Sequence, residues 1–159
     1  MGMSLSGKLF LVPWLIALLA IMAFSLSGKQ VPAGLIGGAE QASPSDWIQE
    51  HNISVQQDRV VLEIENPLWA SFTDTNSMDP LLDESAHAIE IMPKEASAIH
   101  AGDVIAYKTG YGVVIHRVVN VSEDNRGIYY QVKGDNNRFQ DPFKVRFEEV
   151  RGVVVAVIY

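Results

Sequence analysis

Four side chains in this sequence have the types and the order that nucleophilic hydrolysis requires. Ser77 lies in Thr-Asn-Ser-Met-Asp-Pro, His116 lies in Ile-His-Arg-Val, and Asp135 and Asp141 lie on either side of Asn-Asn-Arg-Phe-Gln. A serine hydroxyl needs a base to take its proton at neutral pH, and an imidazole titrates in that range. The imidazole in turn needs a carboxylate that fixes its tautomer and stabilises its charged form. The set predicts a serine nucleophile, a histidine base and an aspartate acid.

Each of these residues has a plainer explanation when it is taken alone. A serine near a proline and an aspartate after a glycine commonly form turns. A histidine in a β-branched run is commonly a core residue whose ring bonds a backbone carbonyl, because a buried polar group needs a partner. The argument for chemistry is therefore the conjunction of the three motifs. The other histidines, His51, His87 and His100, lie outside them, and we interpret these three as surface or structural residues.

The composition argues against several other functions. The chain has 159 residues, no cysteine and a formal net charge of -7, so we expect no disulfide and no thiolate metal site. No run of Lys and Arg is present that could neutralise a nucleic-acid backbone, which argues against a nucleic-acid partner. The histidines are not placed at the spacings of zinc ligands. We predict neither a metal nor a cofactor.

The N-terminal part contains one long apolar segment. Residues 9–26 carry no charge and, as a helix, would measure about 27 Å, which is enough to cross a bilayer. A cleaved signal peptide is the alternative, with Lys8 before the segment and small residues at Ala23 and Ser25. The segment is longer than the ~7–15-residue apolar core of a signal peptide, so a retained single-pass anchor is favoured. Residues 1–8 then form a short cytoplasmic segment, and the catalytic domain lies on the extracytoplasmic side of the membrane.

The elements that must position the four side chains follow this segment. Residues 27–58 are rich in Gly, Ala and Ser at first, which predicts a flexible tether, with a short helix at 43–50 where Ser43 and Pro44 give start signals. From residue 59 the apolar period becomes two. Strand-like runs separated by Gly or Pro turns occur at 60–65, 87–92, 104–107, 113–119, 128–132 and 152–159. The pattern predicts a mostly β, strongly coiled domain over residues 59–159.

Taken together, the motifs resemble those of type I signal peptidases, and more narrowly the archaeal and endoplasmic-reticulum branch. The bacterial branch has a lysine base in an Ile-Lys-Arg-Val strand, where this chain has His116. Gly-Asp-Val-Ile-Ala-Tyr-Lys from Gly102 and Lys-Gly-Asp-Asn-Asn from Lys133 also match the family pattern. The resemblance covers roughly residues 60–155. It departs at Thr75 and Asn76, where the family commonly has Ser-Gly.

The resemblance implies a coiled β fold of the signal-peptidase type and a serine endopeptidase that removes signal peptides from exported preproteins, cutting after small residues. It makes Ser77 the nucleophile and His116 the general base. Asp141 is the first choice for the triad acid, with Asp135 as a supporting acid near the histidine or a turn-former. The backbone N–H of Ser77 and the hydroxyl of Thr75 would donate to the oxyanion. The expected partners are preprotein signal peptides and membrane lipid.

Other functions stay open. A maturase dedicated to a single secreted or pilin-like substrate would use the same residues. A self-cleaving repressor is disfavoured, because no DNA-binding domain fits in residues 1–58 and such proteins use a lysine base. A catalytically inactive, membrane-tethered β domain that binds a partner is the alternative from another class. Catalysis requires Ser77 Oγ within hydrogen-bond reach of His116, with a carboxylate on the other side of the ring.

Overall fold

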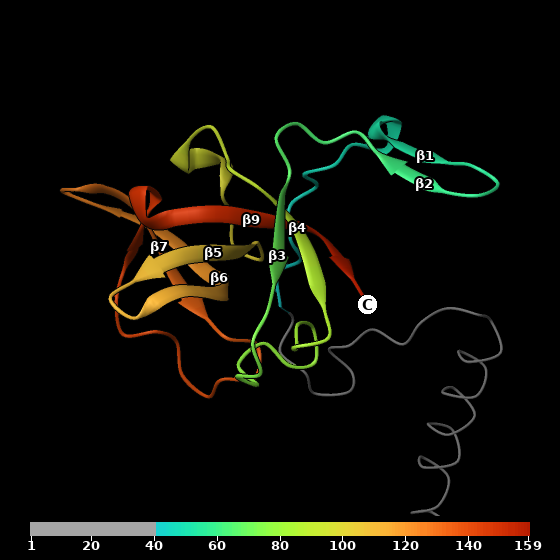
Figure 1. Cartoon of the computed structure of the whole chain (residues 1–159). Coiled ribbons are helices and arrows are strands. Elements are labelled where there is room, and N and C mark those ends of the chain that lie inside the picture. Colours follow the sequence, from blue (N-terminus) through green and yellow to red (C-terminus); the bar gives the residue numbers. More distant parts are fainter. Residues whose placement is uncertain (1–40) are drawn as a thin grey trace, which may run out of the picture. The chain divides into compact units, whose positions relative to one another are not determined.

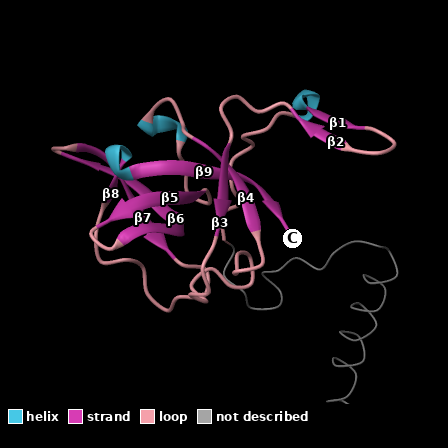
Figure 2. Cartoon of the chain, in the orientation of Figure 1, coloured by secondary structure: helices cyan, strands magenta, loops and turns pink. Residues whose placement is uncertain are grey.

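A computed structural model describes residues 41–159, and this part of the chain is mostly β, as the sequence predicts (Figures 1 and 2). The predicted N-terminal segment 1–8, the membrane helix 9–26 and the tether up to residue 40 lie outside the described residues. Among the residues that are described, none forms a helix with the length and apolarity to span a bilayer. The strands are β1 Ile53–Val55, β2 Val60–Leu62, β3 Leu68–Ser71, β4 His87–Ile91, β5 Val104–Thr109, β6 Gly112–Asp124, β7 Gly127–Lys133, β8 Val145–Arg146 and β9 Val150–Ile158, and the 3₁₀ turns are η2 Glu50–Asn52, η3 Ala96–Ala98 and η4 Phe147–Glu149.

Seven of these strands form one antiparallel sheet in the order β3-β4-β9-β5-β6-β7-β8, while β1 and β2 form a separate hairpin. β9 joins the two parts of the sheet, because its first half pairs with β5 and its second half pairs with β4 (Figure 1). The ladders shift register between Ile89 and Glu90, between Ala106 and Tyr107, and after Val118. Such bulges bend a strand and increase its twist, which explains the strong coiling of the sheet.

The sheet buries a separate apolar cluster on each face. Side chains alternate along β5, so Ile105 and Tyr107 enter one cluster whereas Val104 belongs to the other. The register between β5 and β6 pairs Ile105 with His116 and Val104 with Arg117. His116 and Arg117 are therefore neighbours in sequence that point to opposite faces of the sheet.

The long predicted strands are confirmed, and the short ones were missed. β4, β5, β6, β7 and β9 fall where the sequence predicts strands, and β6 is longer than its predicted run. β2 ends at Leu62, earlier than the alternating pattern indicates. β1, β3 and β8 were not predicted. β1 lies within the predicted tether 27–58, so the first strand begins before residue 59, and the compact unit that holds all the strands begins at Ala42.

The short helix predicted at 43–50 is wrong. This segment is extended, and only the single 3₁₀ turn η2 follows it. Its backbone and side chains bond to Asp103, whose carboxylate accepts Ser45 N–H at 2.7 Å and Trp47 Nε1–H at 3.0 Å. Because Asp103 is fully buried, it needs these donors, and their bonds outweigh the local helix-start signals.

Candidate active site

His116 lies in β6 and its ring is held from one side by Asp141. His116 Nδ1 is 3.0 Å from Asp141 Oδ2, and the two side chains are 8% and 11% exposed. Asp141 reaches this position because its N–H donates to Val132 O at the end of β7, beside β6. A ring that donates Nδ1–H to a carboxylate carries its lone pair on Nε2, which is the arrangement that a general base requires.

Tyr107, which sequence reasoning did not select, completes this cluster. Its hydroxyl donates to Asp141 Oδ2 and lies 3.3 Å from His116 Nδ1. Burial, together with the bond to Asp141, raises the pKa of the Tyr107 phenol, so the hydroxyl keeps its proton at neutral pH. Strand alternation could have identified Tyr107. Ile105 is the cross-strand partner of His116, and Tyr107, two residues further along β5, is on the same face of the sheet.

Asp135 bonds a different residue and does not contact His116. Both of its carboxylate oxygens accept hydrogen bonds from Arg117, at 2.8 Å from Nε and 2.6 Å from NH2. Arg117 NH1 also donates to Gly102 O at 2.8 Å. Asp135 thus forms an ion pair with Arg117 that links the turn after β7 to β6 and to the loop before β5.

Ser77 lies in the loop between β3, which ends at Ser71, and β4, which begins at His87. The preceding residue, Asn76, has φ +54°, a left-handed conformation that asparagine tolerates better than most side chains. Asparagine can therefore occupy a position where the motif that the sequence resembles has a glycine. Asn136 fixes the loop by donating its N–H to Ser77 O at 3.0 Å and its Nδ2–H to Asn76 O at 2.9 Å.

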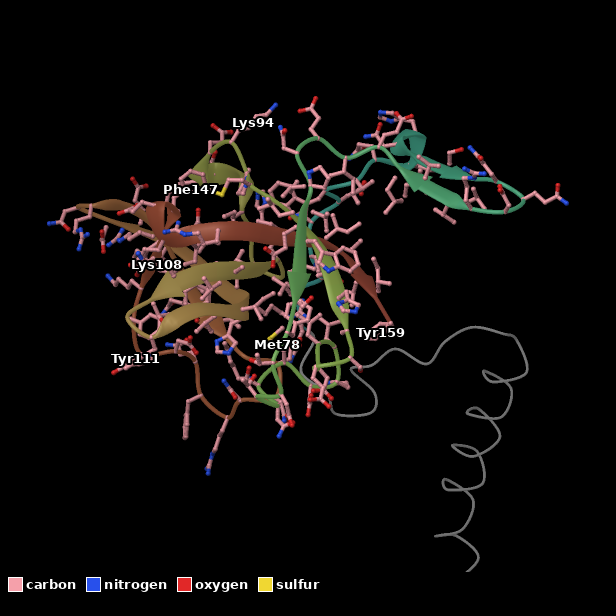
Figure 3. The ribbon with its side chains drawn as sticks, viewed as in Figure 1. Met78, Lys94, Lys108, Tyr111, Phe147 and Tyr159 are labelled. Atoms are coloured by element: carbon pink, nitrogen blue, oxygen red, sulfur yellow. The ribbon has the colours of Figure 1, made fainter. Side chains whose placement is uncertain are left out.

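The glycine of the second motif allows this contact. A Cβ on Gly134 would lie 2.5 Å from Ser77 O, so no larger residue fits without moving the loop that carries Ser77. Met78 is buried, and its sulfur accepts the Asp135 N–H at 3.5 Å. The Met78 side chain lies at the end of the sheet where these loops meet (Figure 3). The turn at 134–137 therefore positions the backbone of Ser77.

Ser77 is half-buried, and its hydroxyl bonds a neighbouring residue. Ser77 Oγ is 3.2 Å from Thr75 Oγ1, and within residues 41–159 no hydrogen bond joins Ser77 to His116. The Ser77 N–H has no acceptor in this part of the chain. The structure thus presents two pairs, Ser77 with Thr75 and His116 with Asp141. Ser77 and Ile115, the residue before His116, line the same pocket.

That pocket has a volume of about 490 Å³. Its walls are largely apolar and come from the end of β3, the loop that carries Ser77 and the first residues of β6, with Glu90 and Arg151 as its charged members. A larger cleft of about 1150 Å³ is lined by Trp47, Glu63 and Lys94 among others, and it contains none of the predicted site residues. The smaller pocket is therefore the one that the candidate nucleophile faces.

The other histidines have different surroundings. His87 stacks on Trp69 with ring centroids 5.1 Å apart, and its Nδ1 is 3.4 Å from Ser71 Oγ. His100 Nδ1 is 3.3 Å from Ser45 Oγ, and His51 is exposed in η2. In the described part of the chain no carboxylate bonds any of these three rings. The same residues contain no group of three acidic or histidine side chains that could hold a metal ion.

Comparison with known proteins adds no family to this description. No protein-family model and no curated protein matches the chain. Any functional assignment therefore depends on the fold and on the residues of the site.

Proposed function

We propose that this protein is a membrane-anchored serine endopeptidase that removes signal peptides from exported preproteins and cuts after small residues. The observation that carries the proposal is the His116–Asp141 bond at 3.0 Å, backed by Tyr107, because it leaves Nε2 of a nearly buried imidazole as the basic atom. The bond joins the two residues that the sequence motifs pair as base and acid.

In the proposed first step, Nε2 of His116 takes the proton of Ser77 Oγ while Oγ attacks the carbonyl carbon of the scissile bond. The oxyanion receives hydrogen bonds from the Ser77 N–H, which has no acceptor within residues 41–159, and from the Thr75 hydroxyl. When the intermediate collapses, the C–N bond breaks, and His116 gives its proton to the leaving amine. The product is an ester at Ser77.

In the second step water hydrolyses this ester. His116 takes a proton from water as the oxygen attacks the acyl carbon, and it returns the proton to Ser77 Oγ when the ester bond breaks. Asp141 stabilises the imidazolium that forms in each half of the reaction.

Both steps require the Ser77 hydroxyl to exchange its partner. In the free protein Ser77 Oγ bonds Thr75 Oγ1. Rotation about the Ser77 side chain towards His116 breaks this bond, and it also frees the Thr75 hydroxyl to donate to the oxyanion. Catalytic hydrogen bonds commonly tighten only when substrate binds, so the proposal places the Ser77–His116 hydrogen bond in the substrate complex.

The substrate binds in an extended form in this proposal. β3 is at the edge of the seven-stranded sheet and leads directly into the nucleophile loop, so an extended peptide can add to it as a further strand. The apolar pocket beside Ser77 then receives side chains close to the cut. The apolar segment 9–26 holds the domain at the membrane surface, on the extracytoplasmic side, where preproteins emerge.

A catalytically inactive tethered domain would also show the Ser77–Thr75 bond. Cleavage of a model preprotein by the purified full chain in detergent distinguishes a peptidase from such an inactive domain. We expect one product whose new N-terminus follows a small residue. Ser77→Ala should abolish cleavage. Ser71→Ala is the matched control, because Ser71 lines the same pocket and bonds His87. Cleavage by Ser77→Ala at the wild-type rate would exclude the proposed nucleophile. A maturase would cut only one of a panel of preproteins.

A further inference from the structure

Glu90 is a buried carboxyl group in the pocket beside Ser77. It lies in β4 and is only 6% exposed, yet it lines the same cavity as the candidate nucleophile. Its place is made by a glycine of the adjacent strand. A Cβ on Gly152 would be 2.6 Å from Glu90 Oε2 and 2.9 Å from Glu90 Cβ, so only glycine leaves room for this side chain. The β-bulge between Ile89 and Glu90 lies at the same point.

The Glu90 carboxyl group has no partner in residues 41–159. No hydrogen bond and no ion pair reaches it, whereas the other buried acid, Asp103, is surrounded by donors. Among the described residues no side-chain oxygen is both sealed from solvent and without a partner, so the Glu90 carboxyl still meets solvent, and it does so where it lines the pocket. Partial burial raises the pKa of the Glu90 carboxyl. A group that enters the pocket from outside can supply the missing partner.

We propose that Glu90 selects a hydroxyl-bearing side chain, serine or threonine, in the substrate residues that precede the cut. The inference rests on the proposed peptidase function and deepens it, because it adds a polar requirement to a pocket with largely apolar walls. An acceptor held at a fixed position in a largely apolar pocket discriminates strongly, since a bound substrate without the hydroxyl excludes solvent from the acceptor and leaves it unpaired.

Arg151 decides between a hydroxyl and a cationic substrate side chain. It lines the same pocket, and its NH1 donates to Glu148 O at 3.0 Å and to Val150 O at 2.9 Å. The Arg151 guanidinium is permanently charged, so a second cation entering the pocket meets its repulsion. A neutral hydroxyl satisfies Glu90 without that penalty.

The test compares threonine with valine, which has nearly the same shape but no hydroxyl. The full chain in detergent cleaves a fluorogenic peptide in which each of the four residues before the cut is in turn Ala, Val, Thr or Lys, and kcat/KM is measured for each peptide. We expect one position at which Thr exceeds Val by about tenfold or more. Glu90→Leu should bring this ratio to about one, and Glu90→Gln should keep most of it because the amide oxygen still accepts a hydrogen bond.

The ratio within one variant is independent of how much enzyme is folded, so a purely structural role of Glu90 leaves it unchanged. Val113→Ala is the matched control, since it alters the wall of the same pocket without touching an acceptor and should retain the ratio. Equal kcat/KM for Thr and Val at every position, a ratio that survives in Glu90→Leu, or a preference for Lys would each overturn the inference. If the wild type cleaves nothing, the proposed function fails separately. Calorimetric Kd values for the same peptides then test Glu90 alone, and equal values for Thr and Val overturn it.

Discussion

His116 and Arg117 are adjacent in β6, and each holds one aspartate of the same loop, but the two pairs differ in what they leave free. Arg117 donates to both carboxylate oxygens of Asp135 and to the backbone carbonyl of Gly102, so its guanidinium links the Asp135 turn to the loop before β5. His116 bonds Asp141 through Nδ1 alone, which leaves its second ring nitrogen available. The strand alternation sends the two side chains to opposite faces of the sheet. The Arg117–Asp135 pair holds the loop, and the His116–Asp141 pair is the one that we propose transfers a proton.

The largest expected effect is a loss of activity when a residue of the His116–Asp141 pair is replaced. His116→Ala should reduce kcat by about 10⁴-fold or more, as the loss of a triad base does. The unfolding midpoint in urea should stay close to that of the wild type, because Asp141 keeps its bond to Tyr107. A large loss of stability together with a small loss of activity would place His116 in the same structural role as Arg117.

Arg117→Leu tests the Arg117–Asp135 pair, and it should reduce stability more than activity. It leaves the Asp135 carboxylate without its partner in a site where the two side chains are only 14% and 15% exposed. Removing one partner of a fully buried ion pair costs about 3–5 kcal/mol, and partial exposure reduces this to about 2–3 kcal/mol of unfolding free energy. Urea denaturation measures the loss. An unchanged midpoint would show that the ion pair does not hold the turn at 134–137.

Tyr107→Phe probes how the acid of the reactive pair is held. The variant removes one donor to Asp141 while keeping the aromatic ring in the core. One hydrogen bond to a charged group is worth about 1.5 kcal/mol, so kcat should fall about tenfold. KM should change little, because Tyr107 does not line the pocket beside Ser77. A rise in KM with constant kcat would mean that Tyr107 acts on substrate binding and not on the base.

The smallest expected effect concerns Glu90, whose carboxyl is paired neither with an arginine, as Asp135 is, nor with a histidine, as Asp141 is, within residues 41–159. Its carboxyl pKa is raised by burial, so the folded state favours the uncharged acid. The corresponding stability is fully present below the ordinary carboxyl pKa of about 4.3, and it is lost as the pH rises through the folded pKa. The Glu90→Gln variant has no ionisable group at this position, so it does not lose this contribution. The thermal midpoint of the variant should therefore rise relative to that of the wild type as the pH increases above about 4. A difference that is constant from pH 4 to pH 8 would contradict this.

The sequence predicted the elements whose signals are local and long. The β-branched run that contains His116 predicts β6, and the motifs singled out Ser77, Asp135 and Asp141 in the loops. β3 and β8 were missed because strands of four and two residues depend on their partners more than on their own side chains. The extended segment at Ser45 was mistaken for a helix because the carboxylate that binds it, Asp103, is 58 residues away.

The roles of two further residues also depend on contacts that no sequence pattern shows. Tyr107 resembles any core aromatic until the register places it beside His116. In the sequence Glu90 resembles an outward-facing strand residue between two isoleucines, but it shares the buried face of β4 with Ala88, and Gly152 of the adjacent strand leaves room for its side chain. Long-range register and the space next to a glycine decide both cases.

The most direct test of the account measures the two aspartates side by side, as Asp141→Asn and Asp135→Asn. For each full-length variant, kcat/KM on a model preprotein and the free energy of unfolding are determined in the same detergent. Asp141→Asn should lose about 10³–10⁴-fold in kcat/KM with nearly wild-type stability, because asparagine cannot stabilise the imidazolium. Asp135→Asn should lose stability by about 2 kcal/mol and keep most of its activity under conditions where it is folded. The reverse pattern, with Asp135→Asn inactive but stable and Asp141→Asn active, would contradict the assignment of His116 and Asp141 as the reactive pair.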